Sequence, residues 1–345
     1  MSESTSVAVS PDSGEHWAAP GAWQVADGIH RIPLPLPMDG LKAVNVYAIE
    51  TPAGLTLVDG GWAVPEAREA LEKGLALIGA GVGDVREVLV THIHRDHYTL
   101  ASVLRGEVGA RIALGAPERA TLDLVHAGAA DSRPQLVAAG ARAVLEAWGD
   151  WTPPPADLDH WRYPDVWLDG DTTVAVGART LDAVHTPGHT RGHYVYADQP
   201  AGLLFAGDHV LPTITPSVGF EPAAAASPLG DFMASLTRMR ALPDLRLLPA
   251  HGPVAPSSHA RVDQLLAHHE HRLDLCLASL DGGPKTAYGV AHDLPWTRHE
   301  HAFGTLDVFN QTLATLETMA HLEVLVARAQ ATRTETADGV LFAMA

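Results

Sequence analysis

Apolar and polar positions change period along the first third of the chain. Residues 24–61 contain short runs rich in β-branched residues, such as "AVNVYAIE" and "GLTLVDGG", separated by Pro and Gly, which is typical of strands. Residues 65–79 have helical spacing and start at Pro65, and residues 85–91 form an apolar run expected to be a buried strand. This alternation predicts a layered α/β architecture.

Residues 117–165 interrupt the alternation with a mostly helical pattern that ends in a Pro-rich link. We expect a helical insertion there, for which two interpretations are open. It is either a packed helical pair or a lid over the substrate that carries Trp148, Trp151 and Trp161. Strand patterns return after the insertion and continue to about residue 256.

Helical spacing dominates the end of the chain. Apolar residues recur at helical intervals between positions 306 and 324, after a candidate N-cap at Thr305, and residues 331–345 predict a hairpin turning at Asp338-Gly339. Helices followed by a hairpin predict a small winged-helix-like domain. We therefore divide the chain into a disordered tail (1–20), a catalytic domain (21–256) and this C-terminal domain (257–345).

Charge and composition restrict the partners. The 345 residues carry a formal charge of −18, and such an acidic surface repels phosphate backbones. Within residues 255–345, six basic and eleven acidic residues give −5, so we expect packing or dimerisation there and no nucleic-acid binding. No apolar run approaches the roughly 18 residues that span a bilayer, and the polar N-terminus lacks a signal-peptide pattern. We expect a cytoplasmic protein with a small-molecule substrate, no membrane partner and a homodimer left open.

Cys276 is the only cysteine. A single cysteine excludes an intrachain disulfide and a cluster of thiolate ligands. Its helical, apolar surroundings predict a buried structural thiol.

Four predicted strands end in residues that bind metals well. The segments "THIHRDHY", "HTPGHTRGH", "GDH" and "AHG" supply His92, His94, Asp96, His97, His185, His189, His193, Asp208, His209 and His251. Imidazole and carboxylate groups together suit Zn²⁺, Mn²⁺ or Fe²⁺. His92 and His94 are two residues apart, so in extended backbone they point to the same side. Asp96 and His97 follow a turn and can face a second metal, and Asp208 is placed to bridge the two ions.

The motifs "LVDGG", "THIHRDH", "HTPGHT", "FAGD" and "AHG", in this order, resemble those of the metallo-β-lactamase-fold metallohydrolase superfamily over residues 23–253. The helical tail resembles that of the glyoxalase II and lactamase-beta-like protein 2 subgroup. The resemblance implies a four-layer αββα sandwich with a C-terminal winged-helix-like appendage. It also implies a first metal held by His92, His94 and His189, a second held by Asp96, His97 and His251, Asp208 as the bridging ligand, and Asp59 as a carboxylate that orients a ligand or loop.

The function implied is hydrolysis by a dinuclear centre. Two Zn²⁺ ions per chain, with Fe²⁺ or Mn²⁺ as alternatives, would lower the pKa of a bridging water to about 7. The resulting hydroxide would attack a small ester, thioester or lactone, while Asp96 or Asp208 takes the proton. The alternative is a mononuclear iron dioxygenase acting on a persulfide-type sulfur substrate, because that subgroup keeps most of these motifs.

The remaining polar residues near the motifs have supporting roles in this scheme. We expect His185 and His193 to support the ligands from behind. Tyr98 and His209 are candidate substrate contacts, with a pocket wall as the other interpretation of Tyr98. Outside the motifs, the histidines at 268, 269 and 271 are expected to form a solvated helix face, with adventitious metal binding as the other interpretation.

Overall fold

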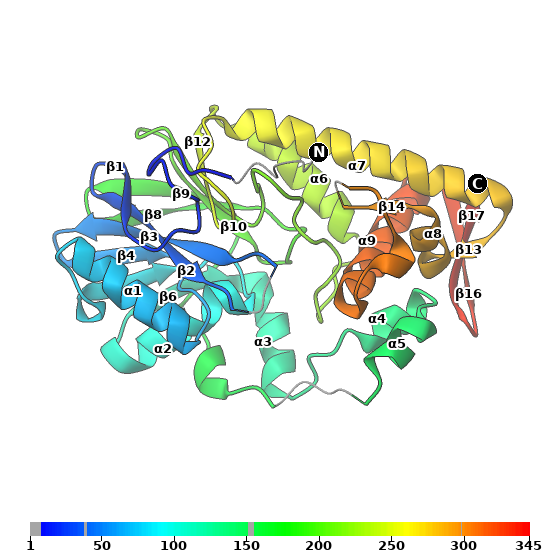
Figure 1. The fold of residues 1–345 in the computed structure, drawn as a ribbon, viewed down its shortest axis with the longest axis horizontal. Coiled ribbons are helices and arrows are strands. Elements are labelled where there is room, and N and C mark those ends of the chain that lie inside the picture. The colour runs from blue at the N-terminus through cyan, green and yellow to red at the C-terminus, as the bar shows by residue number, and fades with distance from the viewer. Residues whose placement is uncertain (1–7, 38–39, 151–154, 298) are drawn as a thin grey trace, which may run out of the picture.

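Two β-sheets packed face to face form one side of the molecule, and the C-terminal helices lie on the other (Figure 1). The structure is a computed structural model that describes residues 8–37, 40–150, 155–297 and 299–345. The first sheet contains, in spatial order, β1 (Trp23–Ala26), β2 (Ile29–Pro35), β3 (Ala43–Thr51), β4 (Gly54–Val58), β5 (Val85–Leu89), β6 (Arg111–Gly115) and β7 (Val166–Leu168). The second contains β12 (Arg246–Pro249), β11 (Leu203–Gly207), β10 (Tyr194–Asp198), β9 (Arg179–His185) and β8 (Thr172–Val176).

The direction of the strands determines where the loops gather. Strands β1 to β4 pair antiparallel, whereas β4 to β7 pair parallel. In the second sheet β11 and β12 also run parallel. Carboxyl ends of parallel strands meet at one edge of a sheet. The loops after β4, β5 and β6 therefore lie beside one another at the edge of the first sheet, and the loops after β11 and β12 do so at the edge of the second. The two sheets meet through an apolar cluster in which the rings of Tyr47 and Phe205 lie 5.3 Å apart.

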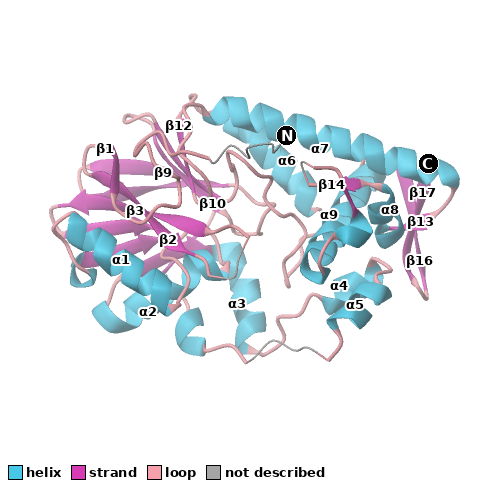
Figure 2. Cartoon of the chain, in the orientation of Figure 1, coloured by secondary structure: helices cyan, strands magenta, loops and turns pink. Residues whose placement is uncertain are grey.

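Helices cover the outer faces of both sheets (Figure 2). Helices α1 (Pro65–Leu77) and α2 (Arg95–Val108) pack on the first sheet, because their buried residues share one apolar cluster with β2 to β6. Helices α6 (Pro228–Met239) and α7 (Ser258–Ser279) share another with the second sheet. The predicted αββα sandwich is therefore confirmed.

The helices of the segment after β6 form two groups, the first beside α2 and the second beside the C-terminal helices. The elements of this segment are η2 (Ala116–Glu118), α3 (Arg119–His126), α4 (Arg133–Ala138), α5 (Arg142–Trp148) and η3 (Leu158–Trp161). The Trp148 indole donates a hydrogen bond to Thr312 Oγ1 at 3.0 Å, so α5 is tied to the C-terminal helices. The Trp161 ring packs on the Tyr98 ring with a centroid distance of 6.3 Å. These contacts favour the packed-pair interpretation over the lid, and Trp151 lies outside the described residues.

The C-terminal part contains α8 (Ala287–Asp293), α9 (Val308–Ala327) and the short strands β13 (Lys285–Thr286), β14 (Pro295–Trp296) and β15 (His301–Ala302). Strands β16 (Ala331–Thr336) and β17 (Gly339–Met344) form the predicted hairpin. Thr336 lies opposite Gly339, so the turn is Ala337-Asp338, one residue earlier than expected. The N-cap of α9 is Asp307, whose carboxylate accepts from the Asn310 N–H, and not Thr305. One apolar cluster runs from the second sheet through α6 and α7 into α9, so this part shares a core with the sandwich.

The predicted disordered tail is wrong for residues 8–20. Trp17 is only 7% exposed, and the Asp12 carboxylate pairs with the fully buried Arg31 guanidinium at 2.9 Å. The Trp17 carbonyl accepts a further hydrogen bond from Arg31. This segment therefore packs against β2 through contacts with Arg31. Residues 1–7 lie outside the described part of the chain.

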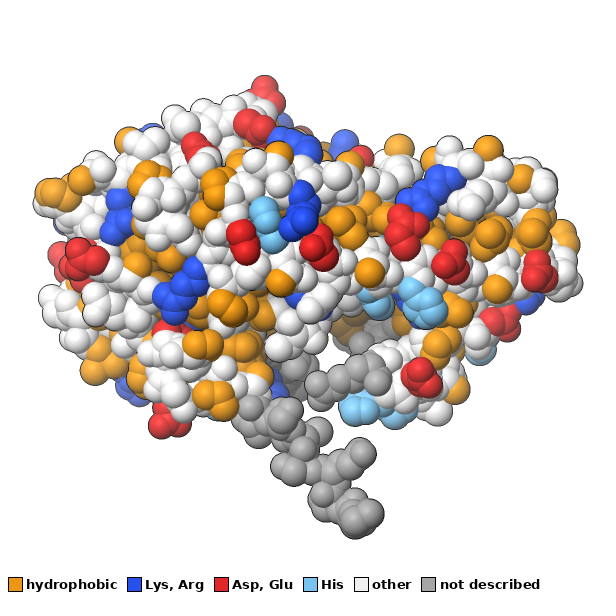
Figure 3. All heavy atoms as spheres, turned by 90° about the horizontal axis from the view of Figure 1, so that it is seen from above, with side chains coloured by type: hydrophobic (Ala, Val, Ile, Leu, Met, Phe, Trp, Pro, Cys, Tyr) orange, Lys and Arg blue, Asp and Glu red, His pale blue; other side chains and the backbone are white. Residues whose placement is uncertain are grey.

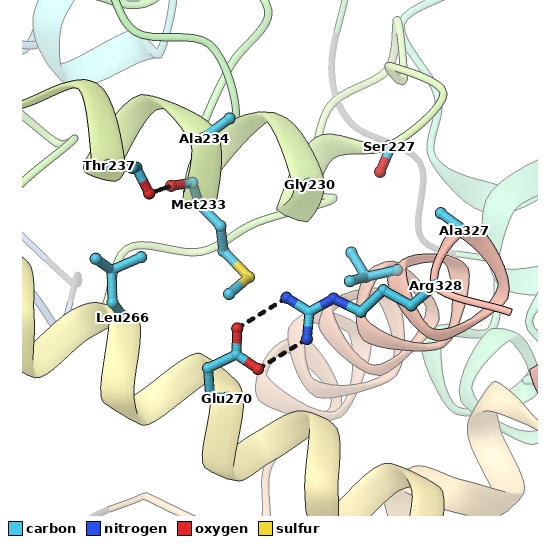
Figure 4. A pocket seen from close by; sticks show the side chains of 10 residues that line it. Ser227, Gly230, Met233, Ala234, Thr237, Leu266, Glu270, Ala327 and Arg328 are labelled. Atoms are coloured by element: carbon cyan, nitrogen blue, oxygen red, sulfur yellow. Dashed lines mark hydrogen bonds and ion pairs between the residues drawn. The ribbon is translucent and has the colours of Figure 1, made fainter. Parts of the chain in front are cut away.

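The surface mixes charges of both signs. On the face seen in Figure 3, acidic and basic side chains of the described residues are interspersed. A groove between α6, α7 and α9 is lined by Met233 and Leu266 and bordered by a paired Glu270 and Arg328 (Figure 4). None of the predicted metal ligands lines this groove. Within the described residues, we find no helix with the length and apolar character needed to cross a bilayer.

Candidate metal centre

Seven predicted ligand residues come together at one edge of the sandwich. The loop from β5 to α2 brings His92 and His94, and the first turn of α2 brings Asp96 and His97. The loops after β9, β11 and β12 bring His189, Asp208 and His251. All these side chains are buried except those of His94 and Asp96, which are partly exposed. Residues far apart in sequence thus form one enclosed polar cluster.

The first ligand set is a triangle of imidazole nitrogens. His92 Nε2 lies 3.0 Å from His94 Nδ1, and His189 Nε2 lies 3.2 Å and 2.9 Å from these two atoms. Nitrogens that bind one Zn²⁺ at 2.0–2.1 Å in tetrahedral geometry are about 3.3 Å apart. The triangle therefore fits one metal ion.

The second set combines two imidazoles with carboxylate oxygens. His251 Nε2 lies 3.3 Å from Asp96 Oδ2 and 3.4 Å from Asp208 Oδ1, and His97 Nε2 lies 3.6 Å from each of these oxygens. Within the described residues, both nitrogens and Asp208 Oδ1 are buried without a hydrogen-bond partner. Buried polar atoms are normally satisfied, so this set fits a second ion.

Asp208 lies between the two sets. Its Oδ2 is 3.5 Å from His189 Nε2 in the first set, whereas its Oδ1 faces His97 and His251 in the second. One carboxylate oxygen is thus available to each ion. This is the geometry expected of a bridging ligand.

Hydrogen bonds behind the ligands fix which ring nitrogen faces the centre. The Nδ1–H groups of His189 and His251 donate to the carbonyls of Ser217 (2.7 Å) and Ala43 (2.8 Å), since a carbonyl can only accept. His97 Nδ1 bonds Asp59 Oδ2 at 2.9 Å. Each bond leaves Nε2 directed inward as the atom available to a metal ion. The two carbonyl contacts could not be read from the sequence, because they involve backbone atoms of distant loops.

Asp59 has the orienting position that the resemblance implied. Besides His97, its carboxylate accepts hydrogen bonds from the Thr91 N–H (2.8 Å) and the Thr91 hydroxyl (3.0 Å). Its backbone has φ = 62°, a left-handed conformation that Asp tolerates better than most residues. Asp59 therefore joins the end of β4 to the loop that carries the first ligands.

His193 supports Asp208 from behind. The Asp208 N–H donates to His193 Nε2 at 3.1 Å, and the Thr186 hydroxyl contacts Nδ1 at 2.9 Å. The intervening Gly207 has φ = 50°, and a Cβ there would lie 2.7 Å from His193 Nε2. His185 is further out, with Nε2 on the Arg191 carbonyl at 2.9 Å. Both histidines are structural supports in this arrangement.

The two candidate substrate contacts face away from the ligands. Tyr98 is fully buried and its hydroxyl donates to the Arg162 carbonyl. His209 is also fully buried, with its ring 5.1 Å from that of Phe232 on α6. Neither side chain is exposed to a substrate, so the expected contacts are not formed, and Tyr98 fits the interpretation as a wall. The cause is packing by distant elements: the 159–162 segment covers Tyr98 and α6 covers His209.

The electrostatics of the second set favour cations. Burial opposes protonation of His97, but the surrounding carboxylates of Asp59, Asp96 and Asp208 raise its pKa to about 9. Burial likewise opposes protonation of His251, but Asp208 and then Asp96 raise its pKa well above the usual value. Without a bound cation, two protons therefore occupy this set at pH 7. A metal ion has to displace them.

Binding of the second ion should depend on pH. Because the pKa of His97 is raised to about 9 and that of His251 well above its usual value, lowering the pH strengthens the competition between protons and metal, and raising it relieves this competition. We expect the affinity for the second Zn²⁺ ion to fall by roughly tenfold per pH unit for each displaced proton between about pH 8 and pH 6. Competition with a chromophoric chelator, corrected for its own protonation, measures this. An affinity that is the same at both ends of this range would contradict the electrostatic assignment.

Glu118, which the sequence interpretation missed, connects two ligand loops. It is fully buried after β6, and its Oε1 accepts from the Thr190 hydroxyl (2.5 Å) and the Ile93 N–H (3.3 Å). Ile93 lies between two ligands and Thr190 follows a third. Burial, and then the Glu221 carboxylate, raise the pKa of Glu118 and favour its neutral form. The signal available in the sequence was an acidic residue shortly after β6, the strand that pairs with β5.

Replacement of Glu118 tests its role as a hydrogen-bond acceptor between the two loops. We expect Glu118→Gln to keep activity within about twofold, because an amide oxygen still accepts both bonds, and Glu118→Ala to lose about 10-fold or more. Steady-state rates and metal content of both variants measure this. Equal activity of the Ala variant and the wild type would remove Glu118 from the site.

The comparisons with known proteins agree with this geometry. The family model described as the metallo-beta-lactamase superfamily matches residues 39–251. A probable metallo-hydrolase, YqjP, of Bacillus subtilis is 25% identical over 328 residues, which cover 86% of this chain and 91% of that protein. An atrochrysone carboxyl ACP thioesterase, AgnL7, of Paecilomyces divaricatus is 32% identical over 123 residues, 36% of each chain.

Solved structures match over nearly the whole chain. The metallo-beta-lactamase family protein TTHA1429 of Thermus thermophilus has a TM-score of 0.75 and 30% identity, and the alignment covers 93% of this chain and 100% of that one. A beta-lactamase domain protein of Burkholderia ambifaria has a TM-score of 0.75 and 28% identity over 98% of this chain and 99% of that one. The C-terminal helical part is thus included in both matches. Together with the family model, these findings show that the chain belongs to the metallo-β-lactamase superfamily.

Proposed function

We propose that this protein is a dinuclear zinc hydrolase of small esters, thioesters or lactones. The observation that carries the proposal is the division of the Asp208 carboxylate between two separate ligand sets. A mononuclear iron site would use only one of these sets. The name of the relative AgnL7, a thioesterase, supports an acyl-transfer reaction.

The residues would divide the work as follows. His92, His94 and His189 would hold one ion, and Asp96, His97 and His251 the other. The ions would supply a water molecule with a pKa near 7 and polarise the substrate carbonyl.

The chain itself would orient the ligands and move protons. Asp59 and Glu118 keep the ligand loops in place, so the reacting groups need little rearrangement. Asp96, with a side chain 14% exposed against 8% for Asp208, is the better placed carboxylate to pass a proton to the leaving group.

A substrate panel tests the proposal. Purified protein would be assayed against short-chain esters, acyl thioesters and lactones, with oxygen uptake recorded in parallel on a persulfide. We expect turnover of at least one acyl substrate and no oxygen uptake. Oxygen consumption without acyl hydrolysis would replace the hydrolase by the iron dioxygenase alternative.

A further inference from the structure

A second group of metal-binding side chains lies between α7 and α9, outside the strand-end centre. His268 and His269 on α7 and Glu317 on α9 each offer one ligand atom, and the three atoms lie within 4.8 Å of one another. The expected solvated face is wrong for His269, which is fully buried. Its burial depends on α9, which the pattern of α7 alone could not reveal.

Hydrogen bonds fix the orientation of the His269 ring. His321 Nδ1 lies 2.7 Å from the Glu317 carbonyl, so this Nδ1–H donates. In a neutral ring, His321 Nε2 then accepts, and its partner is His269 Nδ1 at 3.2 Å. His269 Nδ1 therefore carries the proton, and its Nε2 carries a lone pair. Burial lowers the pKa of both rings, which keeps them neutral.

The lone pair of His269 Nε2 is unsatisfied. Among the described residues, this buried atom has no hydrogen-bond partner. An imidazole that is held by a hydrogen bond at one nitrogen and presents the other is typical of metal ligands. A buried, unpaired acceptor is otherwise unfavourable, so the geometry calls for an electrophilic partner.

Glu317 lacks a compensating charge in contact with it. Burial raises its pKa, and Arg272 only partly offsets this. Within the described residues no ion pair joins these two side chains, since the Arg272 guanidinium lies over the Trp296 ring at 4.3 Å and donates to the Pro295 carbonyl. A divalent cation at the cluster would neutralise the Glu317 carboxylate.

We propose that His268, His269 and Glu317 form an additional structural site for a Zn²⁺-type cation that joins α7 to α9. Two imidazoles and one carboxylate suit this class of ion. His268 is only partly buried, so it lies at the outer side of the cluster. The cation would stabilise the packing of the C-terminal helices on the sandwich. The proposal does not depend on the reaction at the strand-end centre.

Equilibrium dialysis against buffered Zn²⁺ tests the site. Protein stripped with a chelator would be dialysed, and bound zinc would be measured by elemental analysis. We expect Glu317→Gln and the less buried His268→Ala to bind one ion fewer per chain than wild type. The same one-ion difference is expected in an Asp208→Ala background, which separates this site from the strand-end centre. In that background, the zinc-dependent rise in Tm should also be smaller with Glu317→Gln.

Glu270→Gln is the matched control. This residue follows His269 on α7, and its carboxylate pairs with Arg328, the C-cap residue of α9, at 2.7 and 2.8 Å (Figure 4). The control loses a carboxylate and a link between the same helices without touching the cluster, so it should bind as much zinc as wild type. Equal zinc in wild type, Glu317→Gln and His268→Ala would overturn the proposal, as would an equal loss in the control.

Discussion

Asp208→Ala should reduce kcat/KM for an acyl substrate by about 10³-fold or more, because a bridging ligand supports both ions and several kcal/mol of transition-state stabilisation depend on them. Zinc bound at the strand-end centre should fall at the same time. Steady-state kinetics and elemental analysis of one preparation measure both. His94→Ala, which removes one corner of the imidazole triangle, should also lose hydrolysis.

Asp182→Ala is the control for this experiment. Asp182 lies on β9, the strand that leads to the His189 loop, and its side chain bonds only to Gln199 among the described residues. Its loss should leave the rate unchanged within about twofold, as is usual for surface substitutions. Full activity of both Asp208→Ala and His94→Ala would rule out the proposed centre.

The second large effect is expected from Asp59→Asn. Asn also tolerates the left-handed backbone of this position, but it offers one acceptor oxygen where the carboxylate offers two. It can therefore serve either the Thr91 N–H or the His97 Nδ1–H, but not both. We expect the affinity for the second ion to fall by about 10–100-fold, with little change at the first.

Glu87→Gln controls for a change of charge near the ligand loops. Glu87 lies on β5, two residues before its end, and the charge that acts on its carboxylate is that of Arg111, which is not a ligand. In zinc titrations, the affinity for the second ion should therefore be lower in Asp59→Asn than in Glu87→Gln. Equal affinity for the second ion in Asp59→Asn and Glu87→Gln would mean that Asp59 does not orient His97.

The ligands could be predicted from the sequence because each belongs to a local pattern. An apolar strand, a sharp turn and a His or Asp recur along the chain, and this order is enough to place His92, His189, Asp208 and His251 at one edge. The sandwich follows from the same strands. These features need no knowledge of which helix covers which face.

Residues whose environment is made by distant segments could not be placed in this way. Glu118 acts across the pairing of β6 with β5, and His209 is covered by α6. The polar segment around Asp12 looked disordered because its partner, Arg31, lies 19 positions away. His269 was expected to face solvent because the pattern of α7 alone does not show that α9 packs against it. Each error came from a tertiary contact that overrides the local pattern.

Metal analysis of the Glu317→Gln protein, purified without added metal, tests the central claim most directly, because this variant isolates the strand-end centre. We predict about two zinc ions per chain, together with hydrolysis of an ester, thioester or lactone. About one iron ion per chain, with oxygen uptake and no hydrolysis, would contradict the account.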